Sequence, residues 1–239
     1  MTTDSRTFVL VHGAWHGGWC WREVAARLRA AGHEVYTPTM TGLGERAHLL
    51  RADTGLATCI DDICAVIDTE ELRDVVLVGH SFAGVVISGV ADRLAPAIRQ
   101  LVYLDALVVQ AGQSALSVFP ADVQRERRRT IDAEGWRIAI PEPAKFGVTD
   151  AQQVAWLERR LTPHPLKAYT DPLTLQHALG NGLPKTYVAV TDPWYAPLAP
   201  VRDWVRAQPD WHYRELRAGH DAMLTSPAAL SGLLEELAR

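Results

Sequence analysis

The sequence predicts an α/β protein with a mostly parallel, doubly wound sheet of about six strands. Three observations lead to this prediction. Short β-rich runs alternate with longer amphipathic stretches over residues 7–104, the alternation stops between residues 108 and 181, and it resumes near residue 186. Repeated strand–helix–strand units form parallel crossovers, so this pattern indicates a parallel sheet with helices on both faces.

The first part of the chain supplies four expected strands and three expected helices. The strands are apolar and rich in β-branched or aromatic residues: Thr7–Val11, His33–Thr37, Val75–Val78 and Ile98–Leu104. The amphipathic stretches between them predict helices over Trp19–Ala31, Leu56–Thr69 and Phe82–Leu94. Gly32 follows the first helix and is expected to end it.

The middle of the chain breaks this rhythm. Residues 108–181 carry charged and helical stretches punctuated by prolines and no clear buried strand. Strands are expected again at Thr186–Val190 and Trp211–Leu216, with helices at Pro200–Ala207 and Pro227–Ala238. We therefore expect a core built from residues 1–107 and 182–239. A helical cap, residues 108–181, is inserted after the strand that ends at Asp105.

Composition narrows the function classes. A net charge of −4 gives no reason to expect nucleic acid or an anionic membrane as a partner. The opening "MTTDSR" has no apolar core of a secretory signal and no run is long enough to span a membrane, so a cytoplasmic location is expected. Cys20, Cys59 and Cys64 are odd in number and lack metal-type spacing, which predicts buried free thiols and neither metal nor cofactor. A small-molecule substrate is the expected partner, and a homodimer stays open.

Chemically active side chains follow several of the predicted strands. In a parallel sheet the carboxyl ends of the strands meet at one edge, where functional groups collect. Read in order, those ends give His12-Gly13-Ala14-Trp15, His80-Ser81-Phe82, Asp105, Asp192 and Gly219-His220. A serine, then an acid, then a late histidine is the chain order of one type of Ser-His-Asp triad.

These motifs resemble the α/β-hydrolase superfamily. The resemblance lies in "GHSFAG" around Ser81, in "VHGAWHGGWCW" after the first strand and in the late "GHDAML". Within the superfamily, the sequence is similar to the plant-type methylesterase and hydroxynitrile lyase branch and its bacterial esterase relatives. The similarity covers nearly the whole chain and implies the α/β-hydrolase fold.

Ser81 is the expected nucleophile and His220 its base. A serine hydroxyl is a poor nucleophile at neutral pH and needs an adjacent base. A sharp strand-to-helix turn requires small residues two positions before and after the serine, and these are Gly79 and Ala83. The family usually has glycine at the second position, so Ala83 departs from its pattern, with Gly84 beside it. The alternative is that Ser81 only caps the following helix.

The backbone N–H groups of Ala14 and Phe82 are the expected oxyanion hole. Trp15 follows Ala14 and Phe82 follows Ser81, so we expect the side chains of Trp15 and Phe82 to bind substrate. His12 and His80 flank the two loops, and we expect them to be structural residues that hydrogen-bond backbone.

Two aspartates compete for the role of triad acid. Asp105 closes the apolar strand "LVYLDA", where a carboxylate is costly to bury without a partner such as an imidazole N–H. Asp192 lies in the loop that carries the acid in the methylesterase-like branch, one or two residues before the matching position. We favour Asp105 and keep Asp192 as the alternative.

The expected reaction is hydrolysis of a carboxylic ester or lactone with a small apolar or aromatic portion, through an acyl-enzyme. Lyase relatives carry a threonine and a lysine where this chain has Gly13 and Asp221, which disfavours a cyanide leaving group. A lyase-like or other non-hydrolytic enzyme, or a binding protein with an idle serine, is the alternative. The run "RERRR" in the cap is expected to be a solvated helix face, although a substrate carboxylate could use one of its arginines.

Overall fold

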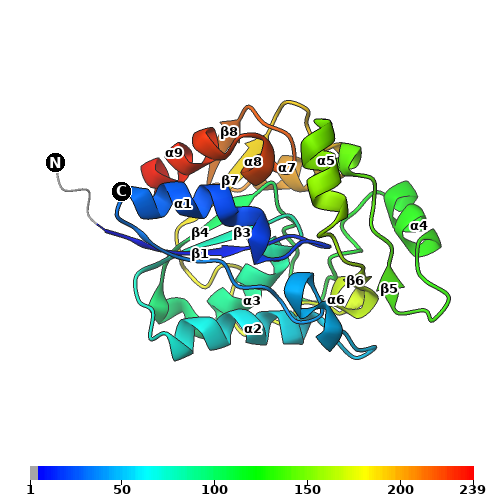
Figure 1. Ribbon diagram of the computed structural model, residues 1–239. Helices are drawn as coiled ribbons and strands as arrows, with labels where there is room; N and C mark the ends of the chain where they lie inside the picture. The colour runs from blue at the N-terminus through cyan, green and yellow to red at the C-terminus, as the bar shows by residue number, and fades with distance from the viewer. Residues whose placement is uncertain (1–4) are drawn as a thin grey trace.

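A computed structural model describes residues 5–239 and shows a central sheet between two layers of helices (Figure 1). The sheet has six strands in the order β2-β1-β3-β4-β7-β8, and every neighbouring pair is parallel. The strands are β1 (Thr7–Val11), β2 (Glu34–Tyr36), β3 (Val75–His80), β4 (Ile98–Leu104), β7 (Lys185–Val190) and β8 (Trp211–Leu216). The predicted parallel, doubly wound α/β sheet is confirmed.

Alternate residues of the strands face opposite layers, which gives the protein two hydrophobic cores. Phe8 and Leu10 of β1 pack into one core with α1 and α9, whereas Val9 and Val11 pack into the other with α2 and α3. The helices are α1 (Arg22–Ala30), α2 (Leu56–Thr69), α3 (Ala83–Leu94), α7 (Ala199–Arg206), α8 (Ala222–Thr225) and α9 (Pro227–Leu237). The central strands β1, β3, β4 and β7 are thus largely buried on both faces, as expected for parallel strands, whereas the edge strands β2 and β8 carry exposed residues.

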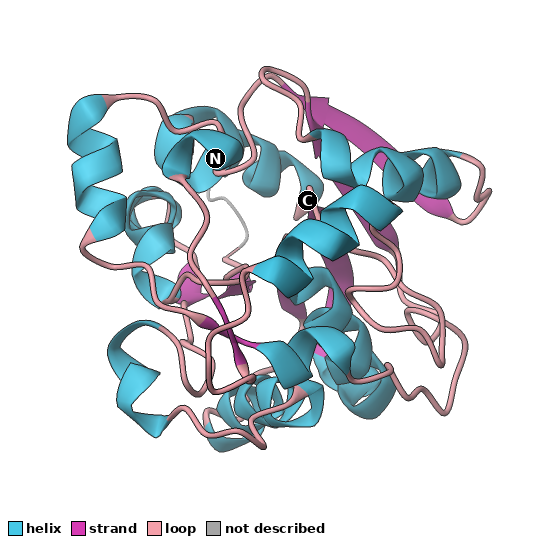
Figure 2. Cartoon of the chain, turned by 90° about the vertical axis from the view of Figure 1, so that its right-hand side faces the viewer, coloured by secondary structure: helices cyan, strands magenta, loops and turns pink. Residues whose placement is uncertain are grey.

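Between β4 and β7 the chain leaves the sheet and packs beyond its carboxyl edge. This segment contains α4 (Ala121–Arg129), β5 (Arg137–Ile138), α5 (Ala151–Glu158), β6 (His164–Pro165) and α6 (Leu166–Thr170). Viewed from that side, short helices joined by long loops lie nearest the reader (Figure 2). The sequence shows no clear buried strand in residues 108–181, but two short strands, β5 and β6, pair antiparallel there. Two residues are too few to show the alternation by which a strand is recognised.

Most predicted boundaries agree with the structure to within a residue or two. The first predicted helix begins with a 3₁₀ turn, Gly18–Trp21, and Gly32 follows it with a φ of +94°. Other 3₁₀ turns lie at Gly44–Leu49, Ala95–Ala97, Pro143–Phe146 and Ala196–Leu198. All three cysteines are buried and unpaired, as predicted. Among the described residues, no helix has the length and apolar character needed to span a bilayer.

Candidate active site

Ser81 lies on a strained turn between β3 and α3. Its φ is +54°, in the left-handed region that costs a non-glycine residue free energy. Backbone hydrogen bonds hold the turn: the Ser81 N–H donates to Leu104 O at 3.2 Å, and the Leu107 N–H donates to Ser81 O at 2.9 Å. The segment after β4 therefore fixes the direction in which the serine side chain projects.

Two glycines allow the turn to pack this tightly. A Cβ on Gly79 would lie 2.8 Å from the carbonyl oxygen of Ala83, and one on Gly84 would lie 2.1 Å from that of Leu107. The closer backbone approach is at Gly84, one position beyond Ala83. This explains how the turn accommodates Ala83, which departs from the usual pattern.

Ser81, His220 and Asp105 form a continuous hydrogen-bonded line. Ser81 Oγ lies 3.0 Å from His220 Nε2, and His220 Nδ1 lies 2.7 Å from Asp105 Oδ2. His220 and Asp105 are buried, whereas Ser81 is partly exposed. Asp192 does not join this line. Its exposed carboxylate accepts a hydrogen bond from Arg217 Nε at 2.9 Å.

Asp105 has a second partner that the sequence analysis did not identify. Arg202 of α7 donates to Asp105 Oδ1 from both Nη2, at 2.5 Å, and Nε, at 3.2 Å. Arg202 lies beside Val201 and Val205 on the buried face of the helix. An arginine beside two apolar residues on a helix is a weak sequence signal, because long side chains often cover apolar surface while their charge stays in water.

The loop after β1 packs directly against the serine turn. A Cβ on Gly13 would lie 2.9 Å from Ser81 Cβ, so only glycine fits there. The next residue, Ala14, and Phe82 are both buried, and within the described chain neither backbone N–H has a hydrogen-bond acceptor. Trp15 follows with a φ of +64°, so three left-handed residues (Trp15, Ser81 and Asp105) gather at this site.

His12 and His80 hold backbone, in agreement with their expected structural role. His12 Nδ1 donates to Gly13 O at 2.8 Å and its Nε2 accepts from the Met40 N–H at 3.1 Å. Burial lowers the pKa of His12 to about 3, so this ring is neutral. His80 Nε2 donates to His220 O at 2.9 Å and so supports the loop that carries His220.

A buried ion pair lies behind this loop. His16 Nε2 is 3.1 Å from Asp221 Oδ2, and His16 Nδ1 donates to Ala14 O at 2.8 Å. Burial alone would lower the pKa of His16, but the charge and hydrogen bond of Asp221 outweigh it and raise that pKa. Burial raises the pKa of Asp221, and His16 reverses this so that the net shift is downward. The pair joins the loop after β1 to the residue that follows His220.

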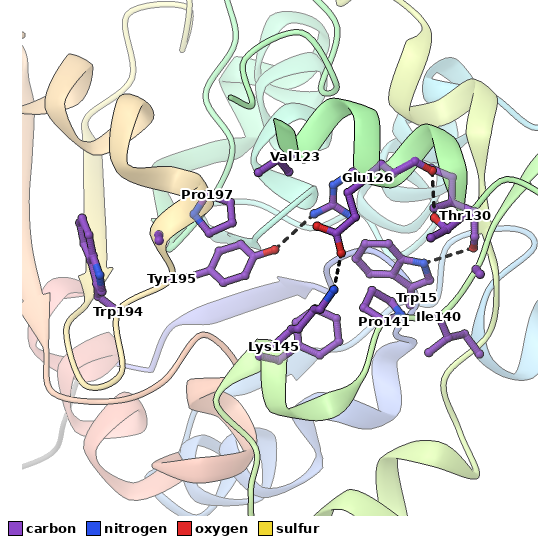
Figure 3. A pocket seen from close by; sticks show the side chains of 15 residues that line it. Trp15, Val123, Glu126, Thr130, Ile140, Pro141, Lys145, Trp194, Tyr195 and Pro197 are labelled. Atoms are coloured by element: carbon purple, nitrogen blue, oxygen red, sulfur yellow. Dashed lines mark hydrogen bonds and ion pairs between the residues drawn. The ribbon is translucent and has the colours of Figure 1, made fainter. Parts of the chain in front are cut away.

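A cavity of about 300 Å³ lies next to His220, whose ring stacks against two of the residues that line it, Phe146 and Tyr195 (Figure 3). Trp15, Phe146 and Tyr195 line it, and the Tyr195 ring stacks on His220 with centroids 4.1 Å apart. Trp15 therefore lies where a substrate-binding residue is expected. Phe82 does not line this cavity, because its ring is buried against His164 and Tyr169. Within residues 5–239, no group of three or more His, Cys, Asp or Glu side chains is placed to hold a metal ion.

Residues 8–233 match the family model described as "Alpha/beta hydrolase family". This chain belongs to the alpha/beta hydrolase family. The predicted resemblance to this family is thereby confirmed. The central sheet of six strands is that of the α/β-hydrolase fold.

Similar proteins identify this α/β-hydrolase as an esterase. A "carbendazim hydrolyzing esterase" from Nocardioides sp. (strain SG-4G) is 41% identical over 96% of this chain and 98% of that protein. "Methylesterase 10" of Arabidopsis thaliana is 26% identical, over 97% of this chain and 91% of the relative. A solved structure of an extracellular α/β-hydrolase from a Paenibacillus species, described as homologous in structure and function to tobacco salicylic acid binding protein 2, superimposes with a TM-score of 0.85. It is 26% identical and the match covers 97% of this chain and 98% of that one.

Proposed function

We propose that this α/β-hydrolase cleaves carboxylic esters through a Ser81–His220–Asp105 triad and an acyl-enzyme intermediate. The observation that carries the proposal is the line of hydrogen bonds from Ser81 Oγ through both nitrogens of His220 to Asp105 Oδ2. This arrangement gives the serine a base and gives the base an orienting carboxylate.

In the first step His220 Nε2 takes the proton of Ser81 as Oγ attacks the ester carbonyl. Asp105 accepts the Nδ1–H, so it fixes the tautomer whose Nε2 is free to act as a base, and it stabilises the imidazolium that forms. His220 then gives the proton to the departing alkoxide, and the alcohol leaves. Water, activated by the same imidazole, hydrolyses the acyl-enzyme and releases the acid.

The amides of Ala14 and Phe82 would stabilise the oxyanion of each tetrahedral intermediate. Both residues are buried beside Ser81, and neither backbone N–H donates to an acceptor within the described chain. Two preorganised amide donors in a water-poor site are worth several kcal/mol to the transition state. Asp105 rather than Asp192 is the acid we propose, because only Asp105 contacts His220.

The acyl portion that best suits the site is apolar or aromatic. Trp15, Phe146 and Tyr195 present ring surfaces to the cavity of about 300 Å³, which is the size of a small-molecule site. Two relatives are named methylesterases, which supports a small alcohol portion such as methanol in the substrate of this enzyme. The relative named for carbendazim makes that compound a further candidate substrate.

A lyase reaction is not favoured at this site. Where lyase relatives carry a lysine, this chain has Asp221, whose buried carboxylate is paired with His16. A carboxylate cannot stabilise a leaving anion, and its pairing keeps it away from the cavity.

The test compares the wild type with Ser81→Ala on methyl and p-nitrophenyl esters of aromatic acids. We expect the variant to lose at least about 10³-fold in kcat, because the oxyanion donors and binding alone leave only a small residual rate. A fluorophosphonate probe should label the wild type at Ser81, identified by peptide mapping, and leave Ser81→Ala unlabelled. The exposed-face variant Ser117→Ala is the control and should match the wild type. Turnover or labelling that survives in Ser81→Ala would rule out the serine mechanism.

A further inference from the structure

Arg127 is buried, although "RERRR" predicts a solvated face. Arg125, Arg128 and Arg129 of α4 are exposed, but Arg127 is only 9% exposed and lines the cavity next to His220. The expectation is thus wrong for this one residue. Only one helical position in three or four faces the interior, so a single inward-facing arginine cannot be recognised within a run of charged residues.

The guanidinium of Arg127 lies among aromatic rings. Its Cζ is 4.6 Å from the centroid of Phe119, 4.9 Å from that of Trp15 and 5.3 Å from that of Tyr169. A cation over aromatic rings is stabilised by the negative potential of the ring faces. The ring faces offer no carboxylate or carbonyl oxygen, so the N–H groups of the guanidinium need other acceptors.

Among the described residues, no carboxylate pairs with Arg127. The nearest acid along the chain, Glu126, forms an ion pair with Lys145 instead (Figure 3). Arg127 Nη2 donates to the Tyr195 hydroxyl at 3.2 Å, and its Nε is buried with no acceptor. A buried charge is normally paired, so an unpaired guanidinium at a cavity is suited to an anion that arrives with the substrate.

Tyr195 connects this guanidinium to the hydrolytic residues. Its ring stacks on His220 and its hydroxyl accepts from Arg127, so a single phenol ring separates the imidazole from the guanidinium. Burial raises the pKa of Tyr195, and the hydroxyl therefore keeps a proton that it can donate to a ligand. A ligand that reaches from Ser81 to Arg127 would therefore pass alongside the ring of Tyr195, which suits an aromatic spacer.

We propose that Arg127 binds a carboxylate carried by the substrate, and that the preferred substrates are mono-esters of aromatic dicarboxylic acids. This inference rests on the proposed function, since it assumes that the ester is cleaved at Ser81. The ester lies toward Ser81, the aromatic spacer lies along Trp15 and Tyr195, and the free carboxylate accepts from Arg127 and the Tyr195 hydroxyl. A planar carboxylate matches the planar fork of a guanidinium, which favours arginine over lysine here.

Two methyl esters of the same shape test the charge preference. Monomethyl terephthalate carries a carboxylate opposite the ester, and methyl 4-acetylbenzoate carries a neutral acetyl group of almost the same size. We expect the wild type to have a kcat/KM roughly 10- to 100-fold higher for the charged ester, as charge-assisted hydrogen bonds to a buried arginine provide. Equal rates, or a preference for the neutral ester, would overturn the inference while leaving the proposed function intact.

Arg127→Met tests whether this residue is responsible. Methionine keeps apolar bulk against the aromatic rings and removes the charge and the donors. We expect kcat/KM for monomethyl terephthalate to fall roughly 10- to 100-fold more than kcat/KM for the neutral ester, mainly through KM. Arg128→Met, on the exposed side of α4, is the matched control and should behave as wild type. An equal loss on both esters would show that Arg127 only supports the cavity wall.

Binding of terephthalate, the dicarboxylate product, supplies a readout that needs no turnover. By calorimetry we expect Ser81→Ala to bind it and the double variant Ser81→Ala/Arg127→Met to bind it at least 10-fold more weakly. The double variant Ser81→Ala/Arg127→Lys keeps the positive charge and should recover part of the binding. Such recovery would show that the loss with methionine is not caused by misfolding. If no protein that retains Arg127 binds terephthalate, the inference fails, whether or not the enzyme cleaves neutral esters.

Discussion

Arg202 and Asp105 form a buried ion pair in which two guanidinium nitrogens donate to one carboxylate oxygen, Oδ1. The other oxygen, Oδ2, is left for His220. Arg202 thereby holds the Asp105 carboxylate in the orientation that faces the imidazole, although the two residues are 97 positions apart in the chain. The pair also joins the carboxyl end of β4 to α7.

Arg202→Met is expected to destabilise the fold and reduce the rate. Removing one partner of a buried ion pair leaves the other charge uncompensated and typically costs about 3–5 kcal/mol. We expect the free energy of unfolding, measured by urea denaturation, to fall by about 3 kcal/mol or more. Arg206→Met on the same helix is the control, since its pair with Glu215 is exposed and should contribute at most about 1 kcal/mol. Equal effects of the two substitutions would contradict the role we give Arg202.

Asp105→Asn and Asp192→Asn discriminate between the two candidate acids. Asparagine at position 105 would present an amide to His220 Nδ1 and favour the wrong tautomer, a change that lowers kcat by about 10⁴-fold in another triad enzyme. The Asp192 carboxylate pairs with the exposed Arg217 and not with His220, so its substitution should alter kcat less than about twofold. Steady-state kinetics on one ester at neutral pH suffice. Inactivity of Asp192→Asn alone would reverse the assignment.

The His16–Asp221 pair is expected to make stability depend on pH. The raised pKa of His16 means that its contribution is complete below the ordinary value of 6.5 and is lost as the pH rises through the higher folded value. The lowered pKa of Asp221 means that its contribution is complete above 3.8 and is lost as the pH falls through the lower folded value. The pair therefore stabilises the fold most between pH 3.8 and 6.5.

His16→Gln tests this window through the free energy of unfolding at several pH values. The difference from wild type should be about 3 kcal/mol near pH 5 and should shrink as the pH is raised past the folded pKa of His16. His48→Gln, an exposed substitution, should give no such trend. A difference that stays constant from pH 5 to alkaline pH would mean that His16 is not charged in the folded protein.

The sequence predicts the parts of this site that depend on local pattern. The apolar run before Ser81 and the apolar strand before Asp105 predict that these two side chains lie at one edge of the sheet. The loop before the last helix predicts that His220 lies at the same edge. The structure has those side chains in contact. The choice between Asp105 and Asp192 could only be a preference, because both follow strands and spacing does not show which carboxylate faces His220.

The remaining features depend on contacts between distant segments. His16 and Asp221 are 205 residues apart, and Arg202 reaches Asp105 across 97 residues. The periodicity of a single helix or strand carries no information about such long-range pairs. The burial of Arg127 could not be predicted for a different reason. Its neighbours in α4 are also charged, so the sequence does not show which position faces inward.

Gly84→Ala tests the close packing that fixes the serine turn. An added Cβ would lie 2.1 Å from Leu107 O, and because that atom is backbone, α3 and the segment after β4 would have to move apart. Overpacking of this kind costs about 1–3 kcal/mol. Gly232→Ala in α9 is the matched control, since a Cβ there meets nothing within 4 Å and alanine should stabilise the helix by about 0.5–1 kcal/mol. Opposite signs in urea denaturation, with a lower kcat only for Gly84→Ala, are the expected result. A stable and fully active Gly84→Ala would show that the turn does not depend on this contact.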